Sequence, residues 1–317
     1  MHRTTYHLLS PVGHEQKSEQ TTMTRYRNYL SASTTLALML IASTTFLQAQ
    51  EMPDDLDALD RILATAGYNG TLVLAHVESG QWLQGTYRNP EETLPPLDID
   101  SAAIPASTFK IFSSLVALQE GVVANADTVI PWDGIERSRT EINQDLRLAD
   151  AFRYSAVPHY QSMVKTVGEA RMQSWLDQAE YGNQNLGGGL TTFWLEGNLR
   201  ITPRQQLTLL QALNNLSLPF DQSVQKTVKD IMINREESGV VIRGKTGLAV
   251  SDNGMNTGWW VGWTDDGKQT WYFATLLQAS QSTLATSSGT QSDFITARQA
   301  VTDQALRLMN VLPPLSQ

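Results

Sequence analysis

Residues 104–112 read Ile-Pro-Ala-Ser-Thr-Phe-Lys-Ile-Phe and lead into an almost wholly apolar stretch that ends near Gly121. A Ser and a Lys three positions apart face the same side of a helix, so the Lys110 amine can lie within hydrogen-bonding distance of the Ser107 hydroxyl. Apolar surroundings lower the pKa of an amine towards the neutral form that a base requires. At a helix N-terminus, the backbone N–H of Ser107 can also face a developing oxyanion. The pattern predicts a serine nucleophile with a lysine base.

A second motif is the single K-T-G triplet, Lys245-Thr246-Gly247, on a strand expected to begin near Val240. A strand edge of this kind beside a Ser–Lys pair is typical of penicillin-recognising enzymes. Two further S-x-x-K matches, Ser162 to Lys165 and Ser223 to Lys226, lie among polar residues and are interpreted as solvated helix faces. Ser251-Asp252-Asn253 follows the K-T-G instead of preceding it, so we interpret it as a turn.

Composition excludes several chemistries. The 317 residues contain no Cys, which excludes thiolate catalysis, iron–sulfur clusters and cysteine-bearing zinc sites. The net charge of −9 disfavours nucleic acid as a partner, because phosphate binding needs a basic surface. Beyond residue 49 the only histidines are His76 and His159, so we expect no metal site.

The N-terminus has the pattern of a secretory signal peptide. Arg25 and Arg27 precede an apolar run at residues 36–47, and the small residue Ala49 follows it. We expect cleavage after Ala49, a periplasmic location and no stable membrane association afterwards, with a retained N-terminal anchor as the alternative. Translation from Met23 would give a signal peptide of ordinary length, so residues 1–22 can be an over-extended start.

The remaining chain, 50–317, is expected to form a single α+β domain. Its hydrophobic patterns predict strands at both ends of this region, a helical middle at 107–229 and a final helix. Within the helical middle, Thr202 is expected to begin a helix. The strands are expected at 71–77, 81–87, 240–245, 258–263 and 269–279. An antiparallel sheet flanked by terminal helices would then form one lobe, from 50–104 and 235–317, and residues 105–234 an inserted, mostly helical lobe. We expect the active site in the cleft between the two lobes.

Taken together, the motifs resemble those of the class D, oxacillinase-type serine β-lactamases, which have the penicillin-recognising fold. The likeness extends over about residues 60–312, and five signatures occur in the family's order: Pro105-Ala106-Ser107-Thr108-Phe109-Lys110, Ser155-Ala156-Val157, Tyr181-Gly182-Asn183, Phe193-Trp194-Leu195-Glu196-Gly197 and Lys245-Thr246-Gly247.

The resemblance implies that the carbonyl of a small-molecule β-lactam acylates Ser107. It also implies that Lys110 reacts with CO2 to become an N-carboxylated lysine, with no other cofactor. The carbamate would accept a proton from Ser107 and later from the hydrolytic water. Trp194 would donate a hydrogen bond to it, and Val157 and Leu195 would wall its pocket.

The same resemblance assigns the other groups of the site. Ser155 would relay a proton to the leaving nitrogen, while Lys245, Thr246 and Arg298 would bind the substrate's carboxylate. The oxyanion hole would be the backbone N–H groups of Ser107 and Leu248, the residue after Gly247. The alternative for Arg298 is a solvated arginine at a helix end.

Two residues depart from the family's usual pattern. Leu248 stands where an aromatic residue is frequent, and Tyr160, a wall of the pocket, stands where Phe is common. Both departures affect the expected substrate range. The Tyr181-Gly182-Asn183 variant implies inhibition by chloride.

The expected function is hydrolysis of penicillin-type antibiotics, which confers resistance, by a monomer or a homodimer. One alternative is a β-lactam sensor or penicillin-binding protein that acylates but turns over poorly. A peptidoglycan transpeptidase or carboxypeptidase usually has Asn where Val157 stands. A Ser-His-Asp hydrolase is less favoured, because no G-x-S-x-G occurs and His76 and His159 are interpreted as structural.

Overall fold

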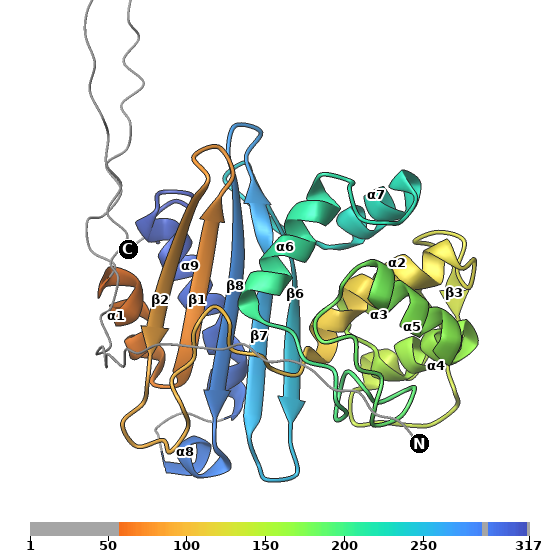
Figure 1. Ribbon diagram of the computed structural model, residues 1–317, viewed down its shortest axis with the longest axis horizontal. Helices are drawn as coiled ribbons and strands as arrows, with labels where there is room; N and C mark the ends of the chain where they lie inside the picture. The colour runs from red at the N-terminus through yellow and green to blue at the C-terminus, as the bar shows by residue number, and fades with distance from the viewer. Residues whose placement is uncertain (1–56, 287–290, 316–317) are drawn as a thin grey trace, which may run out of the picture. The chain divides into compact units, whose positions relative to one another are not determined.

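The computed structural model describes residues 57–286 and 291–315, so the expected signal peptide lies outside the described residues. Its main element is an antiparallel six-stranded sheet in the order β2-β1-β8-β7-β6-β5 (Figure 1). The strands are β1 Asn69–His76, β2 Gln81–Tyr87, β5 Ile233–Glu237, β6 Val240–Val250, β7 Asn256–Asp265 and β8 Thr270–Ala279. A small separate ladder pairs β3 Val129–Ile130 with β4 Leu146–Arg147.

Helices occupy the interval between β2 and β5 and both ends of the described chain. They are α1 Asp57–Ala66, α2 Phe109–Gln119, α3 Leu148–Arg153, α4 Val157–Val167, α5 Glu169–Gln178, α6 Pro203–Asn214, α7 Gln222–Ile231, α8 Gln281–Thr286 and α9 Gln291–Leu308, with short 3-10 turns η1 Ala106–Thr108 and η2 Thr140–Ile142. The arrangement confirms the predicted α+β fold, an antiparallel sheet with terminal helices and an inserted helical lobe.

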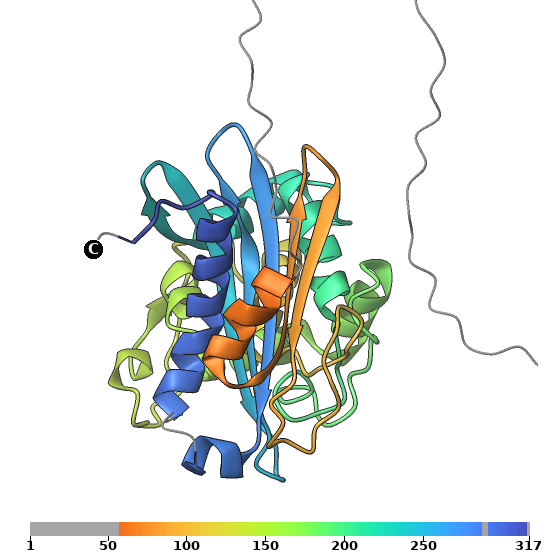
Figure 2. The same cartoon turned by 90° about the vertical axis from the view of Figure 1, so that its left-hand side faces the viewer.

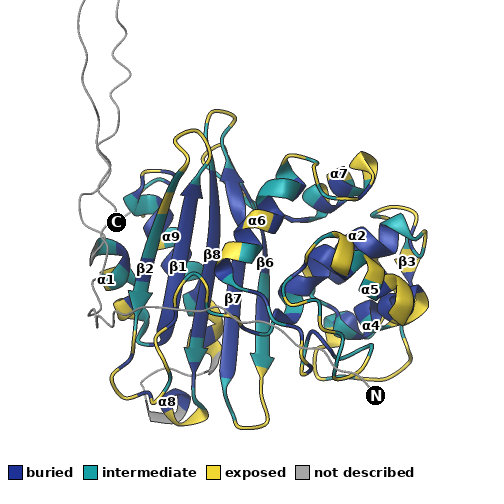
Figure 3. Cartoon of the chain, in the orientation of Figure 1, coloured by how far each residue is buried: buried dark blue, intermediate teal, exposed yellow. Residues whose placement is uncertain are grey.

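Each face of the sheet packs against its own helices because successive side chains of a strand point to opposite faces. In β7, Trp259 and Trp263 lie in the core shared with α2, α4 and α6, whereas Trp260 lies in the core shared with α1 and α9. Figure 2 shows α1 and α9 together over one face of the sheet, and Figure 3 shows that the central strands are buried. The sheet is therefore a buried layer between two helical layers.

The sequence analysis expects terminal helices but assigns no residues to a helix before the strand at 71–77. The first described element is α1, whose Leu59 and Leu63 lie one turn apart and are buried against the sheet. β6 is also longer than expected and continues to Val250. Both differences arise from tertiary packing, since a single amphipathic turn or strand end is a weak local signal.

The predicted start of α6 is confirmed in detail. The Thr202 hydroxyl accepts a hydrogen bond from the backbone N–H of Gln205, whose side chain accepts one from the Thr202 backbone N–H. Pro203 occupies the first helical position, where no hydrogen-bond donor is needed. This reciprocal cap fixes where α6 begins and so places Gln206, whose side chain is used below.

Replacing Thr202 with Ala should lower the free energy of unfolding by about 1 kcal/mol, because the loss of the cap leaves the Gln205 N–H without its acceptor. Urea denaturation measures this loss. Thr208→Ala is the matched control on an exposed position of the same helix, and we expect it to be neutral or slightly stabilising. Equal losses in the two variants would show that the cap contributes nothing.

Candidate active site

The Ser–Lys pair has the geometry that its spacing predicts. Ser107 lies on the 3-10 turn η1, and Lys110 lies in the first turn of α2. The Lys110 Nζ atom is 2.9 Å from the Ser107 Oγ atom. Ala106, immediately before the serine, has φ of 50°, a left-handed conformation that is unfavourable for a residue with a Cβ. The turn therefore holds the serine in a constrained position beside the amine.

The Lys110 side chain is completely buried. Burial lowers its pKa well below the ordinary value, and the positive charges of Lys245 and Arg139 lower the same pKa further. The amine also lies 5.1 Å from the centre of the Tyr160 ring, whose hydroxyl forms a buried hydrogen bond of 2.8 Å with the Ser114 hydroxyl. These surroundings therefore favour the neutral form of the amine beside the serine hydroxyl.

The edge of β6 approaches the serine turn closely. A Cβ atom at Gly247 would lie 2.9 Å from the Pro105 carbonyl oxygen, so only glycine allows this approach. Behind the turn, the Trp259 indole N–H donates to the carbonyl of Ile104 at 2.8 Å. The glycine of the K-T-G triplet therefore lets a strand and the nucleophile's turn pack side by side.

Ser155 and Lys245 are also brought together. The Lys245 Nζ atom donates to the Ser155 Oγ atom at 3.1 Å, and Ser155 itself has a left-handed φ of 54°. Burial, followed by the charges of Arg298 and Arg139, lowers the pKa of Lys245 to about 7. At neutral pH this amine can hold or release a proton beside Ser155.

Arg298 is 4% exposed on α9, which excludes the alternative of a solvated helix-end arginine. One guanidinium nitrogen donates to the Gly247 carbonyl, and Nε donates to the Ile295 carbonyl at 2.9 Å. Gly258 makes room for the side chain, since a Cβ there would lie 2.7 Å from the Arg298 Cδ atom. Burial lowers the pKa of Arg298 to about 10, so it stays positively charged at neutral pH.

The other expected pocket residues differ in exposure. Trp194 is fully buried and stacks on Phe109, with the ring centres 5.4 Å apart. Its indole N–H is buried and has no hydrogen-bond partner among the described residues. Val157, the first residue of α4, and Leu195 are half-buried, as are Thr246 and Leu248 on β6. A buried donor without a partner costs free energy, so the Trp194 indole N–H is expected to donate to a group that binds in the pocket.

The motifs that were set aside lie where the sequence interpretation placed them. Ser162, Lys165, Ser223 and Lys226 are exposed. Residues 251–254 form the turn between β6 and β7.

Neither histidine forms a hydrogen bond with Ser107 in the described part of the chain. The Nε2 atom of His159 is 2.9 Å from the Gln144 carbonyl oxygen, and its Nδ1 atom has no hydrogen-bond partner among the described residues. His76 Nδ1 is 2.7 Å from the hydroxyl of Ser79, next to it in the β1–β2 hairpin.

Two residues near the site escaped the sequence analysis. Gln206 is buried and donates to the Thr108 hydroxyl at 2.9 Å, and Thr108 in turn donates to the Pro105 carbonyl at 2.7 Å. Arg139 lies in the loop between β3 and β4, and its guanidinium donates to the Tyr154 carbonyl at 2.6 Å. Nothing in the local pattern singles out either residue, because a Gln in a helix and an Arg in a polar loop are usually solvated.

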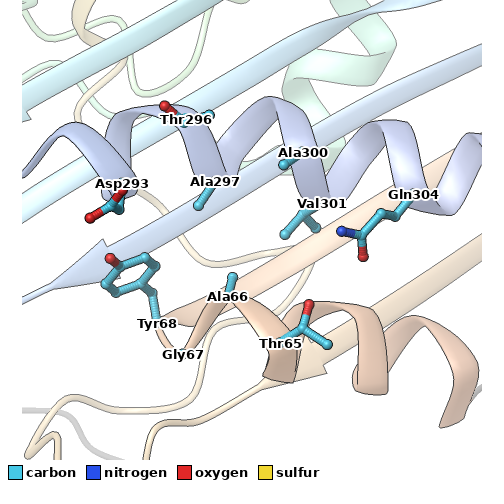
Figure 4. Close-up of a pocket in the computed structure, with 10 residues that line it drawn as sticks. All are labelled: Thr65, Ala66, Gly67, Tyr68, Asp293, Thr296, Ala297, Ala300, Val301 and Gln304. Atoms are coloured by element: carbon cyan, nitrogen blue, oxygen red, sulfur yellow. The ribbon is translucent and has the colours of Figure 1, made fainter. Parts of the chain in front are cut away.

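Two sizeable hollows flank these elements. One, of about 800 Å³, is lined by Ile104, Leu195, Ala249 and the turn at 251–253, and so adjoins the serine turn. The other, of about 480 Å³, lies between α1 and α9, where Tyr68 faces Asp293 (Figure 4). None of the predicted site residues lines the second hollow, whereas Leu195 lines the first.

Comparison with known proteins agrees with this geometry. Residues 70–300 match the family model of the penicillin binding protein transpeptidase domain. The β-lactamase OXA-48 of Klebsiella pneumoniae is 36% identical over 214 residues, which cover 68% of this chain and 77% of that enzyme.

Solved structures give the same result. The class D β-lactamase YbXI from Nostoc is 35% identical, with a TM-score of 0.69 over 80% of this chain and 98% of that one. The C-terminal domain of the BlaR penicillin receptor of Bacillus licheniformis is 27% identical, with a TM-score of 0.68 over 80% of this chain and 96% of that one. The chain is thus similar both to enzymes and to a receptor.

The lowered pKa of Lys245 has a consequence for stability. The unfolded chain keeps this lysine protonated up to about pH 10.4, whereas the native protein loses the proton near pH 7. The free energy of unfolding should therefore rise with pH between about 7 and 10, by at most about 1.4 kcal/mol per pH unit for this group. Urea titrations in bicarbonate-free buffer measure the slope.

The Lys245→Met variant should be more stable than the parent at pH 7 and should show a shallower slope. Lys165→Met, on the exposed face of α4, is the control and should keep the parental slope. A parental slope in Lys245→Met would contradict the lowered pKa.

Proposed function

The chain belongs to the class D β-lactamases, which are hydrolases of the β-lactam amide, and we propose that it acts through an acyl-enzyme on Ser107 with an N-carboxylated Lys110 as the general base. The observation that carries the proposal is the fully buried Lys110 amine, 2.9 Å from the Ser107 oxygen. A serine hydroxyl is a weak nucleophile until a neighbouring base takes its proton.

The surroundings of Lys110 fit carboxylation. CO2 adds only to a neutral amine, and burial together with two nearby cations favours that form. The buried indole N–H of Trp194 supplies an unpaired donor for the carbamate. When present, the carbamate supplies a base for both halves of the reaction, and Val157, Leu195 and Phe109 limit the access of water to it.

The oxyanion hole is proposed to consist of the backbone N–H groups of Ser107 and Leu248. β5 pairs only with residues 240–243 of β6, so the outer edge of β6 is open beyond that point. The Gly244 N–H points outward, because it donates to the Met232 carbonyl at 2.9 Å. Alternate residues of a strand direct their N–H groups to the same edge, so the Leu248 N–H is expected at the open edge of β6, where it could donate to an oxyanion.

Ser155 is proposed to pass a proton to the leaving nitrogen. Its hydroxyl accepts a hydrogen bond from Lys245, whose pKa of about 7 suits proton exchange at neutral pH. A hydroxyl can donate towards the substrate while it accepts from the lysine. Lys245 and Ser155 would then form a proton relay that is separate from the Ser107–Lys110 pair.

The substrate's carboxylate is assigned to Lys245, Thr246 and Arg298. The ion pairs of the described residues leave Lys245 and Arg298 without an acidic partner, although the protein as a whole has a net charge of −9. Arg298 is charged and Lys245 is partly protonated at neutral pH, so the two groups favour an anionic ligand. The acylamino side chain of a penicillin would occupy the hollow beside Ile104 and Leu195.

We also propose that the protein is exported to the periplasm, with cleavage after Ala49, where it would confer resistance to β-lactam antibiotics. Support comes from the basic, apolar and small-residue pattern of residues 25–49. Within the described part of the chain, no helix is long and apolar enough to cross a membrane. N-terminal sequencing of the exported protein should give Gln50 as the first residue, and a blocked or longer N-terminus would contradict the proposed cleavage.

Depletion of CO2 at low pH should abolish turnover of a chromogenic cephalosporin, and bicarbonate should restore it, because the amine alone cannot serve both half-reactions. Trp194→Phe should need more bicarbonate for half-maximal rescue, since it lacks the indole donor. Trp175→Phe removes an indole that donates to Glu120 at the C-terminal end of α2; it is the control and should be rescued as the parent is.

The outcomes separate the alternatives. Sustained turnover that bicarbonate does not affect would exclude the carboxylated lysine. A stoichiometric burst without turnover at saturating bicarbonate would instead indicate a β-lactam sensor that is acylated but not hydrolysed. Retention of the parental rate by Lys110→Ala would remove the assignment of the base altogether.

A further inference from the structure

Arg139 lies in a loop that is closed at both ends and cross-linked inside. The β3–β4 ladder joins the two ends of residues 131–145. Within the loop, Arg137 forms an ion pair of 2.6 Å with Asp133, and its backbone N–H donates to the Asn143 side chain at 3.0 Å. Such bonds hold the loop in one conformation, so the position of Arg139 is defined by the fold.

The Arg139 guanidinium reaches the turn that carries Ser155. Its Nη2 atom donates to the Tyr154 carbonyl at 2.6 Å, and its Nε atom donates to Glu141 at 2.9 Å. Tyr154 immediately precedes Ser155, so one peptide unit separates this hydrogen bond from the serine that contacts Lys245.

The Ser155 turn needs an external partner for its carbonyl groups. It follows α3 as a helix-terminating turn, in which the Ala156 N–H donates to the Ala151 carbonyl at 2.9 Å and Ser155 takes the left-handed conformation with φ of 54°. Glycine or asparagine is usual at such a position, and serine is strained there. The last carbonyls of a helix lack intrahelical donors, and the Arg139 guanidinium supplies one to Tyr154.

Arg139 also adds charge to the site. Its side chain is about half exposed at 50%, and its positive charge lowers the pKa of both Lys110 and Lys245. Lys110 faces Ser107 and the ring of Tyr160. Lys245 faces Ser155, the ring of Phe152 and the charge of Arg298. The charge of Lys245 also acts on Lys110. Glu141 forms an ion pair with Arg139 and so offsets part of its positive charge.

We propose that Arg139 is a positioning residue of the β-lactamase site, which holds the strained Ser155 turn by its hydrogen bond to the Tyr154 carbonyl and keeps a positive charge near the two active-site amines. The inference rests on the proposed roles of Lys110 and Ser155. Arg139 acts through these residues and makes no bond to the reacting atoms.

Loss of the charge should move the acid limb of the pH profile. Without Arg139 the lysines hold their protons to higher pH, so the acid limb of kcat/KM should shift upward, by about half a pH unit for a half-exposed and paired charge. Arg139→Gln should show this shift and about a tenfold fall in kcat/KM at pH 7. Arg139→Lys keeps the charge but not the planar donor, so its acid limb should stay near that of the parent while its rate falls.

Glu141→Gln tests the charge in the opposite direction. It leaves the bond to Tyr154 in place and removes the negative charge that offsets Arg139, so the acid limb should move to lower pH. Arg147→Gln breaks an exposed ion pair with Asp150 at the far end of the loop and is the matched control, with no expected shift. Far-ultraviolet circular dichroism and melting curves check that all variants are folded.

If kcat/KM falls in Arg139→Gln while the acid limb stays in place, Arg139 has only a structural role, and the proposal is overturned. An unchanged rate and profile would overturn it as well. Failure of the carboxylation mechanism is distinguishable, because it appears in the parent enzyme as turnover that does not respond to bicarbonate, whatever the Arg139 variants do.

Discussion

The removal of one amine from water is the constraint on which the site depends. Lys110 is completely buried beside Ser107, and the desolvated ammonium form would cost several kcal/mol without a paired anion. The protein keeps this residue by favouring its neutral form. Burial of the Lys110 amine therefore lowers the stability of the fold, and it also creates a group that can take a proton from a serine. Active sites commonly combine lower stability with higher reactivity in this way.

The surrounding fold converts this constraint into a geometry. Two residues with side chains, Ala106 and Ser155, adopt left-handed conformations, and each lies at or next to a serine of the site. Local strain of this kind persists only where surrounding contacts over-determine the backbone. The close approach of Gly247 to Pro105 and the anchoring of Ile104 by Trp259 supply such contacts on the nucleophile's side, and Arg139 supplies one for Ser155.

Charge has a separate role. The protein is acidic overall, yet the basic side chains of Lys245, Arg298 and Arg139 lie near the serines of the site. This concentration of positive charge suits a substrate with a carboxylate and a reaction that develops an oxyanion. The similarity to both β-lactamases and a penicillin receptor is understandable on this basis, because recognition and acylation need the same cations, and only the release of the acyl group requires a base that still acts after acylation.

The sequence by itself determined the elements of short range: the Ser107–Lys110 pair on a helix, the cap at Thr202, the strands before and after the helical middle, and the solvated character of the other S-x-x-K matches. Each depends on spacing along one element, which periodicity reports directly. The family resemblance added Ser155, Trp194 and Arg298, whose local patterns are weak. Only the tertiary structure decided that Arg298 is buried against Gly247, that the Trp194 indole lacks a partner, and that Arg139 reaches Tyr154. These contacts join residues that are distant in the chain, and burial and charge at such junctions are properties of the packed elements together.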